Sequence, residues 1–210
     1  MMLYRWNVIN TLIKKYGYKN YLEIGLAHGD CYDKISCTKK ANVDPMDDPN
    51  QRVPMYKMTS DEFFENEAPS LEKWDIIFID GLHRDFQVDK DIENSLKFLN
   101  KNGSIVLHDC SPAEERHQLI SEKGGRVSAA ITGTKEWNGD VWKSIVKFRS
   151  TNKDFGCMVI NSDYGLGWIN ESIEIAEPFE YELTYKALES NRQEYLGLVP
   201  PEYFMNLINQ

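Results

Sequence analysis

The sequence lacks the features of several common protein classes. No apolar run approaches the roughly 18 residues that a membrane-spanning helix needs. The formal net charge is -9 and no cluster of lysine and arginine offsets it, which excludes nucleic acid and anionic membranes as expected partners. The N-terminus has no apolar block of the kind found in signal peptides and is patterned as an amphipathic helix.

Cysteine is scarce and scattered. The four cysteines, Cys31, Cys37, Cys110 and Cys157, form no CxxC pair. This spacing favours reduced thiols over a disulfide framework or a zinc site, and we therefore expect a cytoplasmic protein. The sequence also contains no internal repeat and no low-complexity linker, so residues 1–210 are interpreted as one domain.

Short apolar runs alternate with helical stretches along the chain. Strands are predicted at 21–25, 41–45, 52–60, 74–81 and 104–109, and helices at 33–37, 87–103 and 140–150. Residues 155–170 contain two apolar runs around a polar turn, as in a hairpin, and the tail 178–210 is mainly helical. The alternation predicts an α/β fold with a doubly wound, mostly parallel sheet and one antiparallel strand near an edge.

Four of these strands have an acid at or near the carboxyl end: Glu23, Asp44, Asp80 and Asp109. In open parallel sheets, ligands bind in the crevice at the carboxyl ends of the strands. A carboxylate at that place can face a ligand while its strand stays buried. We therefore expect the four acids to gather around one site.

The loop after the first strand, "LEIGLAHGD", carries two glycines. Gly25 and Gly29 permit a tight turn and a close approach of the backbone to a ligand. Ala27 replaces the second glycine of the dinucleotide fingerprint and Glu23 would repel a pyrophosphate, so an NAD-linked oxidoreductase is disfavoured. Glu23 instead suits a ligand with an ammonium group, and Asp44 lies where a ribose diol finds its carboxylate partner.

These two segments resemble the first motifs of the class I S-adenosylmethionine-dependent methyltransferases. An acid followed by x-G-x-x-x-G matches "EIGLAHG", and an acid after the second strand matches "NVDP". The resemblance covers about residues 18–170 and implies a seven-stranded sheet with S-adenosylmethionine as cofactor. In that family the glycine loop holds the methionyl part of the cofactor, which implies Gly25 and Gly29 there, Asp44 at the ribose, and Ser60 and Asp61 of "MTSDEF" at the adenine. Glu23, Ala27 and Asp80 complete the expected cofactor-binding residues. For Asp61, a helix N-cap box beginning at Ser60 is an equal alternative.

"FIDGLH" and "GSIVLHDCSP" resemble a narrower group in that family, the small metal-assisted O-methyltransferases that act on catechols, sugars and antibiotic glycosides. Asp80 and Asp109 match the metal-binding acids of the catechol-type members, but Cys110 replaces their asparagine, and thiols bind magnesium poorly. A set of Asp80, His108 and Asp109 suits manganese or iron better than magnesium. Whether the protein uses a divalent metal at these residues is left open.

His83 is the predicted general base. It follows Asp80 by three positions, the offset at which catechol-type members place their catalytic lysine. Imidazole has an unperturbed pKa of about 6.5 and accepts a proton from a hydroxyl near neutral pH. In this interpretation Asp80 and Asp109 position the acceptor or a metal ion.

The segment 132–148, "TGTKEWNGDVWKSIVKF", is expected to cover the acceptor. Trp137 and Asp140 are candidate substrate contacts, because indole rings stack on sugars and carboxylates bond hydroxyl groups; Tyr164 is a further candidate. Trp142 is expected in the core. The stretches "HDCSP" and "WNGDVWK" are similar to ones in methyltransferases of polysaccharide and glycan assembly.

The sequence thus predicts an O-methyltransferase that acts on a hydroxyl of a sugar or glycan. Two alternatives stay open: a methyltransferase of small catechols or amines, and a non-catalytic cofactor-binding module attached to a glycan-assembly enzyme. For its assembly, the two alternatives are a homodimer and a fusion to a glycosyltransferase.

Overall fold

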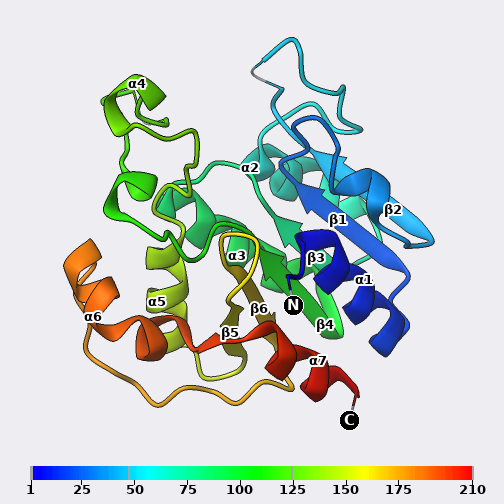
Figure 1. The fold of residues 1–210 in the computed structure, drawn as a ribbon. Coiled ribbons are helices and arrows are strands. Elements are labelled where there is room, and N and C mark those ends of the chain that lie inside the picture. Colours follow the sequence, from blue (N-terminus) through cyan, green and yellow to red (C-terminus); the bar gives the residue numbers. More distant parts are fainter. Residues whose placement is uncertain (1, 47, 124, 210) are drawn as a thin grey trace.

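The computed structural model describes residues 2–46, 48–123 and 125–209. Seven strands form one sheet in the order β2-β1-β3-β4-β6-β5-β7 (Figure 1). Of these strands, β6 runs antiparallel to both of its neighbours, and the other pairs are parallel. The strands are β1 (Asn20–Ile24), β2 (Lys39–Val43), β3 (Trp74–Ile79), β4 (Leu99–Leu107), β5 (Gly156–Ile160), β6 (Leu166–Asn170) and β7 (Leu198–Val199). The predicted doubly wound, mostly parallel sheet with a terminal hairpin is confirmed.

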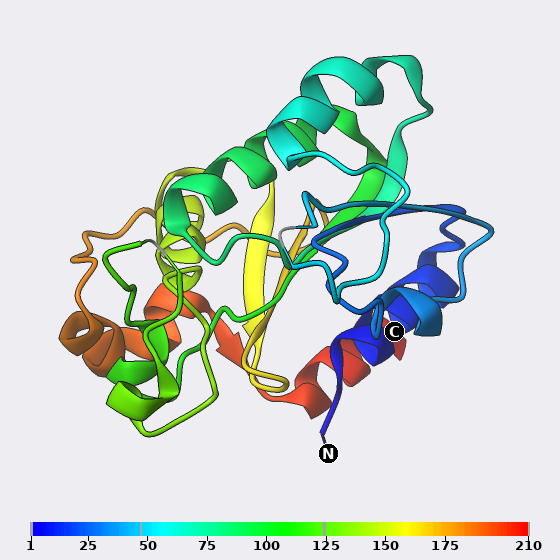
Figure 2. The same cartoon turned by 90° about the horizontal axis from the view of Figure 1, so that it is seen from above.

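Helices cover both faces of the sheet. Helices α1 and α7 pack on one face, and α3, α5 and α6 lie on the other (Figures 1 and 2). The helices are α1 (Arg5–Tyr16), α2 (Ser60–Glu62), α3 (Asp85–Phe98), α4 (Ala129–Thr132), α5 (Trp142–Thr151), α6 (Tyr185–Leu196) and α7 (Pro201–Asn209). In the described part of the chain, every helix is too short or too polar to cross a membrane. All four cysteines are free thiols.

The position of β3 inside the sheet explains why its sequence is apolar at every position from Ile76 to Ile79. Ile77 and Ile79 pack in the core under α3 and α5, while Ile76 and Phe78 pack in the core under α1 and α7. Burying such side chains stabilises the fold by about 1.5–3 kcal/mol each. A strand covered on both faces needs apolar residues on both, and its buried body fixes the position of the polar residues that follow it.

The segment 52–60 is not the strand that the sequence predicted. Its contact with the sheet is an isolated bridge between Val43 and Tyr56. Val53 and Met55 are 71% and 60% exposed, so these positions bury no apolar face, and Pro54 has no N–H to donate to a neighbouring strand. Strand β7, in the C-terminal tail, is the seventh strand instead.

Two predicted helices also have different bounds. The helix expected at 33–37 is a single 3₁₀ turn, Tyr32–Lys34. The helix expected at 87–103 ends at Phe98, and Gly103 lies within β4 rather than at a helix C-terminus. A Cβ at Gly103 would lie 2.7 Å from the Leu99 side chain and 2.9 Å from the Asp75 carbonyl oxygen, so this glycine serves close packing between strands.

Candidate active site

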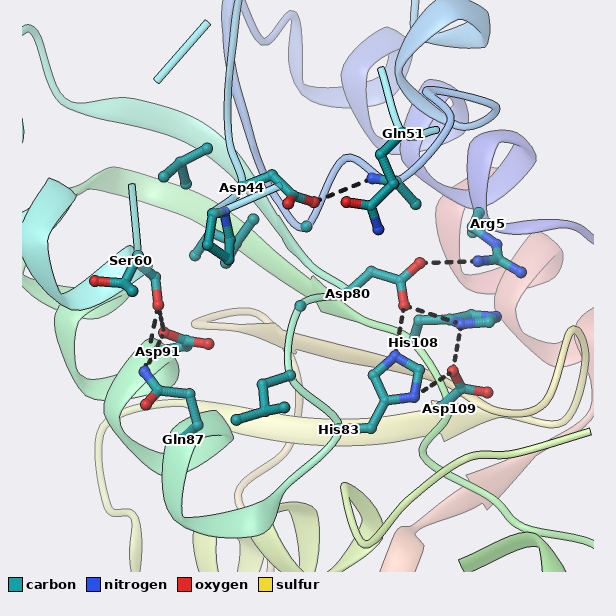
Figure 3. Close-up of a pocket in the computed structure, with 18 residues that line it drawn as sticks. Arg5, Asp44, Gln51, Ser60, Asp80, His83, Gln87, Asp91, His108 and Asp109 are labelled. Carbon is teal, nitrogen blue, oxygen red and sulfur yellow. Dashed lines mark hydrogen bonds and ion pairs between the residues drawn. The ribbon is translucent and has the colours of Figure 1, made fainter. Parts of the chain in front are cut away.

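The carboxyl ends of β1 to β4 open onto one cavity of about 600 Å³ (Figure 3). Eight of the residues predicted from the sequence line this cavity: Gly25, Ala27, Asp44, Ser60, Asp80, His83, His108 and Asp109. Six others are not among its lining residues: Glu23, Gly29, Asp61, Trp137, Asp140 and Tyr164. The polar strand ends therefore gather at one place, as parallel topology requires.

Gly25 marks a close approach between the ends of β1 and β3. Its φ is +89°, and a Cβ at this position would lie 2.1 Å from the carbonyl oxygen of Asp80. Only glycine tolerates both this backbone conformation and this contact. The tight turn brings the backbone of the loop to the cavity wall.

Asp44 orders the same loop from the end of β2. Its Oδ2 accepts hydrogen bonds from the amides of Leu26 and Ala27 at 2.7 and 3.1 Å, and its Oδ1 accepts one from Met46 at 2.6 Å. The carboxylate lines the cavity while it holds the loop. Its role at a ribose stays a prediction.

Glu23 lies behind the loop and not on the cavity wall. Its side chain is 1% exposed and accepts a hydrogen bond from the hydroxyl of Tyr21. Burial raises the pKa of Glu23 to about 8, and the nearby charge of Asp80 acts in the same direction. Glu23 is thus not among the residues that line the cavity, and its contact with the ammonium group of a cofactor stays a prediction.

Two acids and two histidines converge after β3 and β4. His83 Nε2 lies 3.3 Å from Asp80 Oδ1, and His83 Nδ1 lies 3.4 Å from Asp109 Oδ2. His108 Nδ1 lies 3.3 and 2.9 Å from the same two oxygens. Both imidazoles thus face one pair of carboxylate oxygens (Figure 3).

The charges in this cluster shift the pKa values of its members. Burial alone would lower the pKa of His83, but the adjoining carboxylates of Asp80 and Asp109 outweigh it and raise that pKa. The same opposition raises the pKa of His108 well above its ordinary value. Burial would raise the pKa of Asp80, but His108, His83 and Arg5 lower it overall.

Arg5, at the start of α1, reaches into the cavity and was missed by the sequence analysis. Its Nη1 donates to Asp80 Oδ2 at 2.8 Å, and its Nε donates to Asp163 Oδ2 at 3.0 Å. The backbone amide of Arg5 also donates to Asp163 Oδ2 at 2.8 Å. The beginning of the chain is thereby tied to the β5–β6 turn and to the acid cluster. No local pattern signals this, because the two partners lie 75 and 158 residues away.

The segment 137–140 supports the cluster from one side. Trp137 stacks on His83, with ring centroids 5.0 Å apart and planes inclined by 18°. Asn138 Nδ2 donates to Asp109 Oδ1 at 3.0 Å. The amide of Asp140 donates to the His83 carbonyl at 3.1 Å, and its Oδ1 accepts the first amide of α3 at 2.9 Å. These contacts position the catalytic candidates, and substrate contact by Trp137 or Asp140 stays a prediction.

Apolar and aromatic side chains stand exposed around the same region. Tyr164 is 45% exposed and its ring meets His108 edge-on at 6.1 Å. Leu82 lines the cavity and is 48% exposed. Trp142, in contrast, is fully buried in the core, as expected.

Ser60, Gln87 and Asp91 form the opposite end of the cavity (Figure 3). Asp61 points elsewhere: it accepts hydrogen bonds from Lys90 Nζ and Gln87 Nε2, both at 2.9 Å. A capping box is present, but its N-cap is Thr59 and not Ser60. Gln87 and Asp91 were missed by the sequence analysis, although their spacing of four residues places them on one face of α3.

Gln51 is a further residue that the sequence analysis missed. It lines the cavity, and its side-chain oxygen is buried without a hydrogen-bond partner among the described residues. A buried acceptor without a donor costs free energy, so this oxygen is suited to accept a hydrogen bond from a ligand.

Residues 27–110 match a family model described as a methyltransferase domain. This segment runs from the loop after β1 to three residues beyond the end of β4 and includes Asp44, Asp80, His83 and Asp109. No curated protein matches the chain.

Solved structures share the fold. A putative caffeoyl-CoA O-methyltransferase from Staphylococcus aureus is 20% identical with a TM-score of 0.53, over 81% of this chain and 85% of that one. A putative O-methyltransferase from Klebsiella pneumoniae is 12% identical with a TM-score of 0.56, over 79% of each chain. An O-methyltransferase from Bacillus cereus, solved with S-adenosylhomocysteine (SAH), is 15% identical with a TM-score of 0.50, over 79% of this chain and 78% of that one.

The match of residues 27–110 to a methyltransferase domain and the fold shared with solved O-methyltransferases point in the same direction.

Proposed function

We propose that the protein transfers a methyl group from S-adenosylmethionine to a hydroxyl group of a small-molecule acceptor. The observation that carries this proposal is the position of His83, held between Asp80 and Asp109 at one end of the cavity and stacked on Trp137. S-adenosylmethionine supplies a methyl group already activated on a sulfonium ion. The protein's task is to align the acceptor and remove its proton.

We propose that the cofactor lies along the cavity, and that its adenine and methionyl ends bind different residues. Figure 3 separates Ser60, Gln87 and Asp91 at one end from Arg5, Asp80 and the histidines at the other, with Asp44 between them. We place adenine at the first end, the ribose at Asp44, and the methionyl group beside Gly25. Arg5 is the one lysine or arginine among the described cavity-lining residues, so it is the natural partner of the methionyl carboxylate.

His83 is the proposed base. A base must lie within hydrogen-bond reach of the acceptor hydroxyl and must be neutral when it takes the proton. The flanking carboxylates raise its pKa, which makes the imidazole a stronger proton acceptor and also leaves more of it protonated at neutral pH. Asp80 and Asp109 stabilise the imidazolium that forms after proton transfer.

The same cluster fits a divalent metal ion. Asp80, His83 and Asp109 each offer a ligand atom, and these atoms lie within 4.8 Å of one another. Nδ1 of His83 and both ring nitrogens of His108 are buried without a hydrogen bond among the described residues, although carboxylate oxygens are close. Carboxylates with imidazole favour manganese over magnesium. When bound, such an ion lowers the pKa of a coordinated hydroxyl.

His83 cannot bind a metal and accept a proton with the same nitrogen. We therefore propose Asp80, Asp109 and His108 as the metal ligands, and His83 as the base. His108 contacts both carboxylates as closely as His83 does. Cys110, next to Asp109, is fully buried and its thiol donates to the His108 carbonyl, so it belongs to the core and not to this donor set.

A planar phenol or catechol is the acceptor that we favour. Leu82 and Tyr164 present exposed apolar surface beside the acid and histidine cluster, which suits an aromatic ring. The sugar or glycan acceptor expected from the sequence takes second place. Two of its three proposed contacts are already engaged, because one face of Trp137 stacks on His83 and Asp140 is 5% exposed.

The test is a methyl-transfer assay with labelled S-adenosylmethionine and a panel of catechols, simple phenols, sugars and amines, with and without manganese or magnesium. We expect transfer to the oxygen of a phenolic acceptor, identified by mass spectrometry of the product. Transfer to sugars alone would restore the acceptor class expected from the sequence. Transfer to an amine alone, independent of metal, would contradict the proposal of O-methylation.

A further inference from the structure

We propose that Asp91 is the residue that selects adenine, by accepting a hydrogen bond from its exocyclic amino group. This inference rests on the cofactor placement proposed above and adds a specificity-determining residue to it. Neither the sequence motifs nor the family resemblance pointed to Asp91, which lies within α3 and not at a strand end.

Asp91 is a buried acid on the cavity wall. Its exposure is 1%, yet it lines the cavity. Its Oδ1 accepts hydrogen bonds from Ser60 Oγ at 2.6 Å and from Gln87 Nε2 at 3.2 Å. Among the described residues, no donor reaches Oδ2, and this oxygen points away from Ser60 and Gln87 (Figure 3). Because Asp91 lines the cavity, its Oδ2 is open to a hydrogen-bond donor on a ligand.

The charge state of Asp91 matches this role. Burial raises its pKa to about 6, while the hydrogen bonds from Ser60 and Gln87 limit the rise. The carboxyl group is therefore mostly ionised above neutral pH and acts as an acceptor only. Adenine presents a two-hydrogen amino donor at its C6 position, whereas hypoxanthine presents a carbonyl oxygen there. A carboxylate bonds the first and repels the second.

The two neighbours of Asp91 also fix what an asparagine would do in its place. Ser60 and Gln87 both donate to Oδ1, so an asparagine at position 91 would keep its carbonyl oxygen there. Its amide nitrogen would then take the Oδ2 position and present hydrogen-bond donors to the ligand. Asp91→Asn should therefore reverse the preference from an amino group to a carbonyl oxygen at C6.

The experiment is isothermal calorimetry of SAH and of S-inosylhomocysteine, its hypoxanthine counterpart. Each ligand is titrated into the full chain, its Asp91→Asn variant and its Asp89→Asn variant. Asp89 is on the same helix, but it pairs with Lys147 away from the cavity, so Asp89→Asn is the matched control. Circular dichroism and thermal melting verify that each variant is folded.

We expect the wild type and Asp89→Asn to bind SAH at least about tenfold more tightly than S-inosylhomocysteine, the scale of one hydrogen bond to a charged group. Asp91→Asn should lose or reverse this ratio. Equal binding of the two ligands by the wild type overturns the inference without using any variant, as does an unchanged ratio in folded Asp91→Asn. Absence of SAH binding to the wild type overturns the proposed cofactor placement itself.

Discussion

Arg5 and Asp80 form a 2.8 Å ion pair although 75 residues separate them in the chain. The pair lies where the start of α1 meets the end of β3. Arg5 also holds Asp163, so its guanidinium bridges two acids at the edge of the cavity. Five N–H groups are available on this side chain, and the described hydrogen bonds leave two of them for a ligand.

If Arg5 binds the methionyl carboxylate, its loss should affect only ligands that carry this group. Arg5→Gln is expected to weaken SAH binding about tenfold or more, and to leave binding of methylthioadenosine, which lacks the amino acid, unchanged. Arg5→Lys should retain part of the SAH affinity. The measurement is calorimetry with both ligands. An equal loss for the two ligands would show that Arg5 only supports the fold.

Replacement of His83 should separate catalysis from cofactor binding. His83→Asn is expected to lower kcat by about 10²- to 10⁴-fold, because the acceptor loses its general base. SAH affinity should stay unchanged, because His83 contacts the acid cluster and Trp137 at the methyl-transfer end. Steady-state kinetics and calorimetry check the two expectations. A variant that retains full kcat would remove His83 from the base role.

Metal binding is testable without any acceptor. Electron paramagnetic resonance of added manganese should report binding to the wild type and a loss of about tenfold or more in affinity for Asp109→Asn. Cys110→Ala is the neighbouring control, since this buried thiol packs in the core, and it should leave manganese affinity unchanged. His108→Asn should weaken manganese binding. Equal manganese affinity in all four proteins would argue against a metal at this cluster.

Glu23 makes stability depend on pH. Folding raises its pKa from 4.5 to about 8, mainly through burial. The folded state then holds the proton more tightly than the unfolded state, so this residue lowers the free energy of unfolding as pH rises through that window. Glu23→Gln accepts the same Tyr21 hydrogen bond and has no proton to lose. Relative to the wild type, its unfolding free energy should increase between about pH 5 and pH 8.5, by up to about 4 kcal/mol.

Urea unfolding at several pH values measures this difference. Glu72→Gln provides the control, because Glu72 forms an exposed ion pair with Lys39. It should follow the wild type across the same window. A constant difference between Glu23→Gln and the wild type at all pH values would mean that Glu23 is ionised in the folded protein throughout.

Residues at strand ends could be predicted from the sequence because their position follows from local pattern and parallel topology. Asp44, Asp80 and Asp109 each end a short apolar run, and such ends meet at one edge of the sheet. Arg5 could not be found in this way, since its place depends on how α1 docks against the β5–β6 turn. Asp91 left a weak signal, a polar pair with Gln87 at helical spacing beside apolar positions.

The wrong strand at 52–60 has a related cause. Val53 and Met55 have the alternating pattern of a half-buried strand, but no layer of the fold covers them and both are exposed. Tertiary packing decides such cases more strongly than β propensity does. The hairpin at β5 and β6 was predictable because both of its strands are buried and its turn is rich in turn-forming residues.

A crystal structure of the protein with SAH tests the central claim most directly. The account predicts adenine against Asp91, Gln87 and Ser60, and the homocysteine carboxylate within hydrogen-bond distance of Arg5, with the sulfur directed towards His83. A ligand bound in the reverse direction, or bound outside this cavity, would contradict the proposed site.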